Sequence, residues 1–455
     1  MPRISRDAVL VLVLVLARVR IDTLAHLVLP QRHQDVARLP LTHYLLSPKA
    51  LELLQDWLTD PLSLLLISVT FGLTLLYLIA DAVKERLGSP WAYRVKLGLL
   101  YGVVISSVVA SSVLLVMLRH ISGPASYTHD GGVIQTEEAL KFFLAGKNPY
   151  VEDYVNTPMA EWGLDYKTAL YHFPYLPWTF TFSTPFYLLS ERLLGWYDQR
   201  FVYLLLFILM LILAPGLAGK PEDKLSLVAV LGLNPIMGVD VIFGQNDSFV
   251  LFWVALSLWA LVKLKGHKGL MLSATSLALA CASKPTAWFL VPFYFLYVWN
   301  QGGKRSTFLQ TLGVFALVGG MLVLPFAIWN LDAMVDDIWR WSSGTAEVSY
   351  QIRGWGIANF VLALGLVNSR LDYFPFWVLE VAFGLPVAIL MAWRQLRDNR
   401  LSNVLYGYGL LLFVFLYFSR FLNENYLGYI LAILALALWI EEGSFSTPLE
   451  NEGVE

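Results

Sequence analysis

One polar stretch of the chain, from Tyr127 to Tyr150, holds residue types that can do chemistry at the face of a membrane. Asp130 is followed by two glycines, which let the backbone turn tightly and leave the carboxylate unobstructed. Such a carboxylate can act as a general base towards a substrate at the level of the lipid headgroups. It can also simply cap a helix, but a cap does not need two glycines after it, so we favour the base.

A short amphipathic helix is predicted directly after this corner, from Val133 to Ala145. Gly146 supplies a stop at its end and Pro149 prevents continuation. The pattern indicates a helix that lies on the membrane surface and does not cross it. Its two acids, Glu137 and Glu138, are more often a solvated face, but either is a candidate contact to a substrate.

The composition identifies the surroundings of this stretch. Of the 455 residues, 57% are hydrophobic and only 15% are charged, whereas a soluble chain has about 25% charged residues. Burying so much apolar surface needs lipid, so the chain is predicted to be an all-α polytopic membrane protein. The net charge of -2 and the absence of a basic block argue against a nucleic-acid partner, and the single cysteine excludes an internal disulfide framework.

Apolar runs and basic turns predict the topology. Pro61 to Ala80 is long enough to span about 30 Å of hydrocarbon, and the basic residues after it predict a cytoplasmic turn. The next span, Leu97–Leu118, therefore leads outward. The loop 119–172 is then external, and its seven acids against four Lys/Arg agree with that side.

We expect about 11–13 transmembrane or half-membrane helices in total. The later candidates are Phe173–Ser190, Phe201–Leu217, Leu225–Ile242, Ser248–Val262, Leu270–Ala282, Thr286–Trp299, Phe308–Ile328, Phe374–Trp393, Leu405–Phe418 and Leu427–Ile440. Basic residues at Arg192/Arg200 and Lys220/Lys224 both predict a cytoplasmic side, with only one apolar segment between them. One segment from Phe201 to Ile242 is therefore expected to be a half-helix or re-entrant, with its irregularity at Asn234-Pro235.

The domain organisation predicted from these patterns is simple. Residues 61–440 form one transmembrane domain with a second external loop at 330–355, and residues 441–455 form an acidic tail. Residues 1–60 leave three alternatives open, namely a signal-like segment, a first helix that reaches Leu29, or a mis-assigned start.

Three further polar clusters lie between apolar segments. Inserting a charged group at the centre of a membrane helix costs roughly 2.5–3.5 kcal/mol of free energy, so such groups are expected to have a compensating partner or a function. In the first, Asp247 can cap a helix, but Gln245 neither caps nor packs well. In the second, Lys284 suits a phosphate, although it can also snorkel to the headgroups. In the third, Arg420 and Glu424 lie between the last two spans.

Basic turns on either side predict that Asp130, Lys284 and Arg420 converge on one external face, with Gln245 beside them if the region around Asn234 is irregular. Cations beside carboxylates at one interface make a site for an anionic lipid headgroup and a base.

In this order, the clusters resemble the GT-C superfamily of polytopic glycosyltransferases. The nearest branch comprises polyprenyl-phosphate-mannose-dependent enzymes and bacterial and archaeal proteins related to the GPI mannosyltransferases. The motifs that carry the resemblance are Asp130, Leu-Ala-Gly-Lys-Asn-Pro-Tyr (144–150), Tyr-His-Phe-Pro-Tyr-Leu-Pro (171–177), Asn234-Pro235, Gly-Gln-Asn-Asp (244–247), Lys284-Pro285 and Asn-Glu-Asn-Tyr (423–426).

The resemblance implies a GT-C-like fold and sugar transfer with inversion. The donor would be a sugar, mannose or another hexose, on a polyprenyl phosphate, and the acceptor a lipid-linked glycan, a glycolipid or a protein. Asp130 would deprotonate the acceptor while Lys284 and Arg420 hold the departing phosphate, with no cofactor and no dedicated metal site. Tyr150 and His172 are further candidate substrate contacts, and the cell membrane is the expected location.

Two departures from the family pattern leave alternatives open. Relatives often show an acidic pair in the first loop, and here the second acid can be Glu137, Glu138, Asp153 or Asp165. Asn423 and Asn425 stand where relatives carry His and Arg or Lys, so the phosphate-binding charge is expected on Arg420 or Arg353. A transporter of a lipid or small solute remains an alternative, because broken helices and intramembrane charge also occur there. A non-catalytic assembly protein on the same fold is the other.

Overall fold

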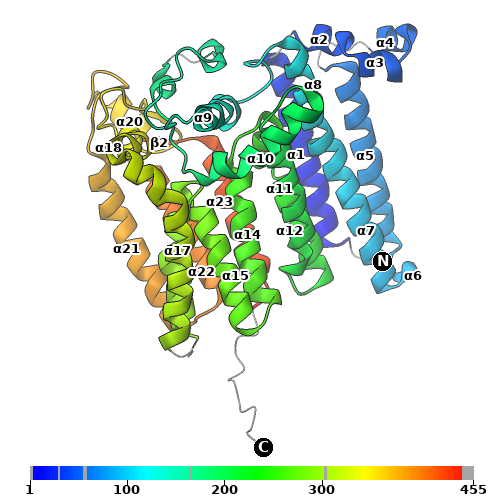
Figure 1. Cartoon of the computed structure of the whole chain (residues 1–455). Helices are drawn as coiled ribbons and strands as arrows, with labels where there is room; N and C mark the ends of the chain where they lie inside the picture. Colours follow the sequence, from blue (N-terminus) through cyan, green and yellow to red (C-terminus); the bar gives the residue numbers. More distant parts are fainter. Residues whose placement is uncertain (1–3, 29–30, 55–58, 164–165, 302–304, 443–455) are drawn as a thin grey trace, which may run out of the picture.

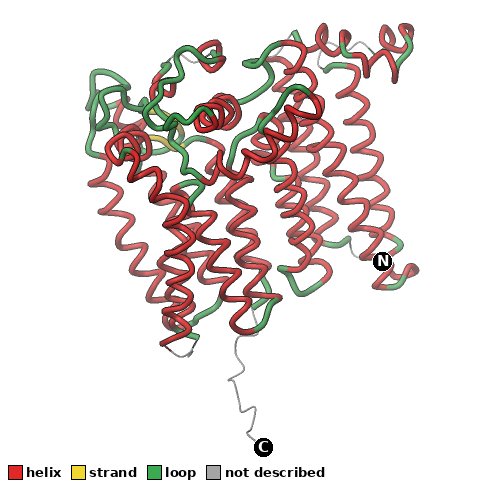
Figure 2. The backbone as a smooth tube through the Cα atoms, viewed as in Figure 1, coloured by secondary structure: helices red, strands yellow, loops and turns green. Residues whose placement is uncertain are grey.

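The computed structural model describes residues 4–28, 31–54, 59–163, 166–301 and 305–442. Within these ranges the chain is almost wholly helical, and its one sheet is a pair of two-residue strands. Figure 2 shows long helices standing side by side, with the irregular segments gathered mainly at one end. Most of the predicted acidic tail, 441–455, lies outside the described residues, which end at Glu442.

Five described helices are long and apolar enough to cross a membrane, or six if one bent pair counts as a span. They are Pro61–Ala82, Ser89–Ser122, Arg305–Trp329, Phe376–Arg397 and Leu401–Phe418. The prediction of an all-α polytopic membrane protein is therefore confirmed. The expected 11–13 crossings and half-crossings include shorter helices, so that number stays a prediction.

The first part of the chain forms a helical group capped by short helices (Figure 1). Its elements are α1 (Arg6–Val28), α2 (Arg32–Arg38), α3 (Pro40–Leu45), α4 (Pro48–Leu53), α5 (Pro61–Ala82), α6 (Lys84–Leu87), α7 (Ser89–Val104), the π-helical turn η1 (Ile105–Val109) and α8 (Ala110–Ser122). Residues 6–28, for which several alternatives were open, form one helix that packs against α12 and α5.

The first loop and the central helices follow. The loop contains η2 (Asp130–Ile134), α9 (Gln135–Leu144), η3 (Pro158–Glu161) and η4 (Thr168–Tyr171), and leads into α10 (Trp178–Leu194). The central elements are α11 (Arg200–Leu213), η5 (Ala214–Gly216), α12 (Pro221–Leu233), α13 (Pro235–Phe243), α14 (Asp247–Lys263), α15 (Gly266–Cys281), η6 (Pro285–Leu290), α16 (Val291–Trp299) and α17 (Arg305–Trp329).

The remaining elements form the second loop and the last helices. They are α18 (Leu331–Val335), η7 (Asp336–Arg340), α19 (Trp341–Ser343), β1 (Arg353–Gly354), α20 (Ala358–Ala363), α21 (Phe376–Arg397), α22 (Leu401–Phe418), β2 (Phe421–Leu422) and α23 (Glu424–Trp439). Strands β1 and β2 pair in parallel and so join the second loop to the turn before α23.

The two ends of the bundle differ in character. The turns around α6, between α14 and α15 and after α21 carry basic residues and lie together at one end, which we call the basic end. The first and second loops lie at the opposite end, which we call the loop end (Figure 1). By the positive-inside rule, the basic end is predicted to be cytoplasmic.

Helix α10 corrects the predicted topology. Its first residue, Trp178, donates its backbone N–H to Ala282 O, while Gln199 beyond its last turn donates to Glu137 in the first loop. Both ends of α10 therefore contact the loop end, and the segment does not lead to the basic end. Arg200 lies at the loop end, where Asp198 neutralises it at 2.7 Å, so the prediction of a cytoplasmic turn at Arg192/Arg200 is wrong.

The predicted irregularity at Asn234-Pro235 is confirmed as a bend of 47° between α12 and α13. Asn234 accepts the backbone N–H groups of Ile236 and Met237 and donates to Gly428 O at 2.8 Å, which replaces the hydrogen bonds that proline removes. Because α12 starts beside the contact of Ala218 with Ile440 and α13 ends beside the first loop, the bent pair runs from one end of the bundle to the other. The prediction that this pair is a half-helix or a re-entrant segment is therefore wrong.

The buried face of α5 is polar, although its lipid-facing side is apolar. Near the basic end, Lys96 of α7 contacts Asp7 at 2.6 Å and Asp81 at 2.7 Å, and all three side chains are buried. Tyr77 donates a hydrogen bond to Asp7 in the same cluster. The cluster therefore links α1, α5 and α7 by charge.

Replacing Lys96 with Met should destabilise the protein by roughly 3–5 kcal/mol, because two buried carboxylates lose their cation. Lys84→Met is the matched control, since Lys84 lies 3.3 Å from Asp81 and is partly exposed; it should cost less than about 1 kcal/mol. Thermal unfolding in detergent would measure both. Equal midpoints for the two variants would contradict a structural role of the buried cluster.

Candidate functional site

A cavity of about 1360 Å³ lies at the loop end of the bundle. Its walls come from the first loop, the turn between α13 and α14, the segment that begins at Lys284, the second loop and the start of α23. Four of the predicted site residues line it, namely Gln245, Lys284, Arg353 and Glu424. The predicted convergence of separate polar clusters on one site therefore holds for these four residues.

Two glycine-containing turns bring the first loop into contact with the turn between α13 and α14. A side chain on Gly132 would overlap the carbonyl oxygen of Gly244, and one on Gly131 would press against the Tyr175 hydroxyl. His129 donates its backbone N–H to Phe243 O at 2.8 Å, which fixes the same contact. The two glycines therefore allow two backbone segments to pack closely at the start of a π-helical turn. The tight turn that the sequence suggested is not formed there, since neither glycine has a positive φ.

Asp130 stands at this contact. Its backbone opens η2, between His129 and Gly131, both of which line the cavity. Its side chain lies outside the described part of the structure, so the predicted role of a general base stays a prediction.

Replacing Gly132 with Ala should destabilise the protein by roughly 1–3 kcal/mol, because the added methyl group forces two backbone segments apart. Gly163→Ala in the same loop is the control, since nothing lies within 4 Å of an added Cβ there. Thermal unfolding of both variants would test this. A Gly132→Ala protein as stable as the control would disprove the close contact.

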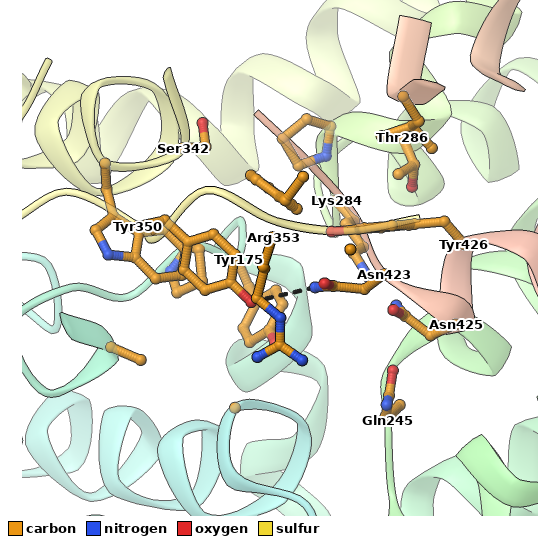
Figure 3. A pocket seen from close by; sticks show the side chains of 18 of the residues that line it. Tyr175, Gln245, Lys284, Thr286, Ser342, Tyr350, Arg353, Asn423, Asn425 and Tyr426 are labelled. Atoms are coloured by element: carbon orange, nitrogen blue, oxygen red, sulfur yellow. Dashed lines mark hydrogen bonds between the residues drawn. The ribbon is translucent and has the colours of Figure 1, made fainter. Parts of the chain in front are cut away.

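Lys284 is the centre of a buried polar network, and Figure 3 shows it beside Tyr426. Its ammonium lies 2.7 Å from Asp247 Oδ1 and donates to Asn246 Oδ1 at 3.0 Å. Asn425 donates to the other oxygen of Asp247 at 2.6 Å, and the Tyr426 ring lies 5.0 Å from the ammonium. Asp247 itself is fully buried behind the cavity. Three distant segments are therefore joined by one ion pair and its hydrogen bonds.

Asn246 has a free donor in this network. Its side chain is only 3% exposed, and its Nδ2 has no hydrogen-bond partner among the described residues, although the residue lines the cavity. It stands at the N-cap position of α14 but makes no side-chain cap. Since Lys284 holds its carbonyl oxygen, the amide N–H groups remain for a ligand.

The two arginines proposed for a phosphate differ in position. The guanidinium of Arg420 is buried and donates to the backbone carbonyls of Tyr350, Asp372 and Arg370. Burial also lowers the pKa of Arg420 to about 10. Arg420 is not among the lining residues, so it supports the second loop from behind. The guanidinium of Arg353 lines the cavity and makes no side-chain hydrogen bond or ion pair with any described residue.

The strand pair positions Arg353. Its backbone N–H donates to Arg420 O, and Gly354 faces Leu422 across β1 and β2. A side chain on Gly354 would overlap the Leu422 backbone, and its φ of 97° also favours glycine. Arg353 is thus held beside Asn423, and both are directed into the cavity in Figure 3.

The acids of α9 lie elsewhere. Residues 135–140 are all buried, so the first half of this helix is enclosed and does not present one solvated face. Glu137 pairs with Arg119 at 2.7 Å, and Glu138 pairs with Lys141 at 2.7 Å. Neither acid is among the lining residues, and their pairing with cations explains their burial.

His172 and Tyr150 also lie behind the lining. Tyr150 donates to Tyr175 O at 2.7 Å. His172 contacts Asp337 of the second loop at 2.9 Å through Nδ1 and donates from Nε2 to Val348 O at 2.8 Å, so it ties the two loops together. Burial raises the pKa of Asp337 to about 6, against the opposing effect of the His172 contact. His172, Asp336 and Asp337 are grouped closely enough to hold a metal ion.

The end of the cavity towards the membrane is apolar. Trp288, Phe289 and Pro292 line it on one side, and Leu411 and Phe415 of α22 on the other. Trp288 is 42% exposed, so this wall reaches the outside of the bundle. The cavity thus has an apolar opening on the side of the bundle, next to Trp288, that leads to a polar interior.

Several lining residues were not predicted as site residues. Four of them lie within motifs named in the sequence analysis, so their motifs could have identified them as site residues: Tyr175, Asn423, Asn425 and Tyr426. Trp341 of the second loop also lines the cavity, and the density of tryptophan in that loop was the only indication.

No protein-family model, curated protein or solved structure matches this chain. Its function therefore has to be argued from the geometry of the cavity.

Proposed function

We propose that this chain is a membrane glycosyltransferase of the GT-C type, which moves a hexose from a polyprenyl phosphate to an acceptor hydroxyl. One observation carries the proposal. A single cavity joins an apolar opening at the membrane to a polar interior directly beside the Asp130 turn. In the described part of the chain, the Arg353 guanidinium and the side-chain N–H groups of Asn246 have no partner in that interior. An amphiphilic substrate with an anionic linkage fits that combination.

The apolar opening suits the lipid part of the donor. Its walls come from η6 with α16 and from the last turns of α22. In this proposal, a prenyl chain from the outer half of the membrane enters between them. The donor phosphate would then reach Arg353 and the amide of Asn246, while Lys284 holds that amide in place. Tyr175 and Asn423 would contact the sugar.

The transfer itself needs one base and one stabilised leaving group. The acceptor oxygen attacks the anomeric carbon, the bond from that carbon to the phosphate oxygen breaks, and the acceptor proton passes to Asp130. The electron pair leaves with the phosphate, whose charge Arg353 stabilises. Attack from the face opposite the phosphate inverts the anomeric centre. With the basic end in the cytoplasm, the reaction takes place on the external face of the cell membrane.

Asp130→Asn should abolish sugar transfer, because the amide cannot accept the proton. Transfer would be measured in membranes that contain the purified protein, radiolabelled polyprenyl-phosphate hexoses and a mixed acceptor pool. Glu161→Gln is the control, because this exposed acid lies in the same loop and does not line the cavity; it should retain full activity. Equal transfer by wild type and Asp130→Asn would remove Asp130 as the base, and movement of lipid or solute without transfer would favour a transporter.

Arg353→Ala should raise the KM for the polyprenyl-phosphate donor about tenfold to a hundredfold, because a charge-assisted contact to phosphate is lost. Arg353→Lys should recover part of that loss. Arg340→Ala is the control, since Arg340 is exposed and pairs with Asp332 outside the cavity. An unchanged KM in Arg353→Ala would show that the phosphate lies elsewhere.

A further inference from the structure

Three side chains that can bind a metal meet where the first loop packs against the second. His172 directly follows η4, and Asp336 and Asp337 open η7. Nδ1 of His172 lies 2.9 Å from Asp337 Oδ1 and 3.5 Å from Asp336 Oδ2. One such atom from each residue lies within 4.8 Å of the other two. We call these three residues the loop-junction cluster. None of the three is among the residues that line the cavity.

The orientation of the His172 ring requires a cation at Nδ1. Nε2 lies 2.8 Å from the carbonyl oxygen of Val348, which can only accept a hydrogen bond, so Nε2 carries a proton. In the neutral ring, Nδ1 then holds a lone pair, and it faces two carboxylates that also have only lone pairs to offer. Histidines that bind a metal usually donate their other ring N–H to a carbonyl or carboxylate in this way.

A proton on Nδ1 would satisfy only part of the cluster. One N–H points in one direction, and Asp337 is the nearer acid, so Asp336 would keep only a contact of 3.5 Å to Arg340. A divalent cation bonds to all three ligand atoms at once. Its charge also balances the two carboxylates beside a neutral imidazole.

The spacing of the ligand atoms fits a small divalent cation. Zinc bonds to nitrogen and to carboxylate oxygen at about 2.0–2.2 Å, so two ligands of one ion lie roughly 3–3.5 Å apart. The two distances from Nδ1 agree with that separation. Phe173 donates its backbone N–H to the other oxygen of Asp337 at 2.9 Å, which orients this carboxylate from outside the cluster. The Asp336 side chain is 31% exposed, so an ion can reach the cluster from solvent.

We propose that the loop-junction cluster binds one zinc ion through Nδ1 of His172 and one oxygen of each acid, with water completing the coordination. An imidazole beside carboxylates suits zinc, whereas magnesium and calcium prefer oxygen ligands alone. The ion would hold the two loops together. Tyr175 and Trp339, close in sequence to the ligands, line the cavity, so the ion would fix part of its wall. It takes no part in the proposed sugar transfer, and its binding does not depend on that function.

Zinc binding to the purified, tag-free, full-length protein in detergent tests the proposal. The protein is freed of metal by dialysis against a chelator and then titrated with zinc by calorimetry. Wild type should bind one ion per chain, and Asp336→Asn should weaken this binding at least about a hundredfold, because one of three protein ligands is lost. Asp332→Asn is the matched control. Asp332 also pairs with Arg340, but its side chain is 80% exposed and it is not part of the cluster, so this variant should bind zinc as wild type does.

Thermal unfolding provides a second readout. Zinc should raise the unfolding midpoint of metal-free wild type and of Asp332→Asn, but not that of Asp336→Asn, because a ligand that binds only the folded state stabilises it. The proposal is overturned if metal-free wild type does not bind zinc, or if Asp336→Asn binds it as tightly as Asp332→Asn does. A midpoint that depends on pH but not on zinc would also overturn it, since a shared proton would then hold the cluster. None of these outcomes depends on sugar transfer, so the proposed function is tested separately.

Discussion

The ion pair between Lys284 and Asp247 is the interaction on which the cavity depends. Both groups are buried, and removing two charges from water costs several kcal/mol per ion unless other hydrogen bonds compensate. Asn246 and Asn425 supply those hydrogen bonds. The pair therefore fixes three segments, the start of α14, the start of η6 and the start of α23, relative to one another. None of these starts can move without leaving a charge unpaired in a low-dielectric environment.

The same principle organises the rest of the loop end. Arg119, Arg200 and Arg420 are all buried, and each is satisfied by acids or carbonyls from segments far away in the chain. Polar groups at this depth would be costly in lipid, so they are enclosed by protein. Among the described residues, buried polar atoms without a hydrogen-bond partner occur in the cavity lining, as at Asn246 and Asn423, and also elsewhere in the bundle, as at Trp253 and Tyr294.

How much of this could be predicted from the sequence depended on the range of the interactions. The membrane class follows from composition, the break at Asn234-Pro235 from the proline, and the place of Lys284 at the loop end from the basic turns on either side of it. The placing of Gln245 rested partly on a cytoplasmic turn at Arg192/Arg200, and that turn was wrong. The course of α10 does not, since an apolar run of that length is equally compatible with a span, and only its contacts with Ala282 and Glu137 exclude one. The sequence also could not show which of Arg353 and Arg420 lines the cavity. Arg420 is held behind the lining by backbone carbonyl groups that lie 48–70 residues away from it in the chain. Glu137 looked solvated because its partner, Arg119, lies on a different helix.

The short parallel pairing of β1 with β2 has a consequence for the biosynthesis of the protein. Arg353 and the support of the second loop by Arg420 both depend on residues 420–422, which directly precede α23, the last helix of the described residues. During synthesis, the early helices and the first loop emerge while the wall that carries Arg353 still lacks its partner strand. The cavity is therefore completed only as the final segment of the chain is inserted. A chain that is truncated before α23 would hold the Asp130 turn but would lack the part of the cavity wall that Glu424, Asn425 and Tyr426 supply.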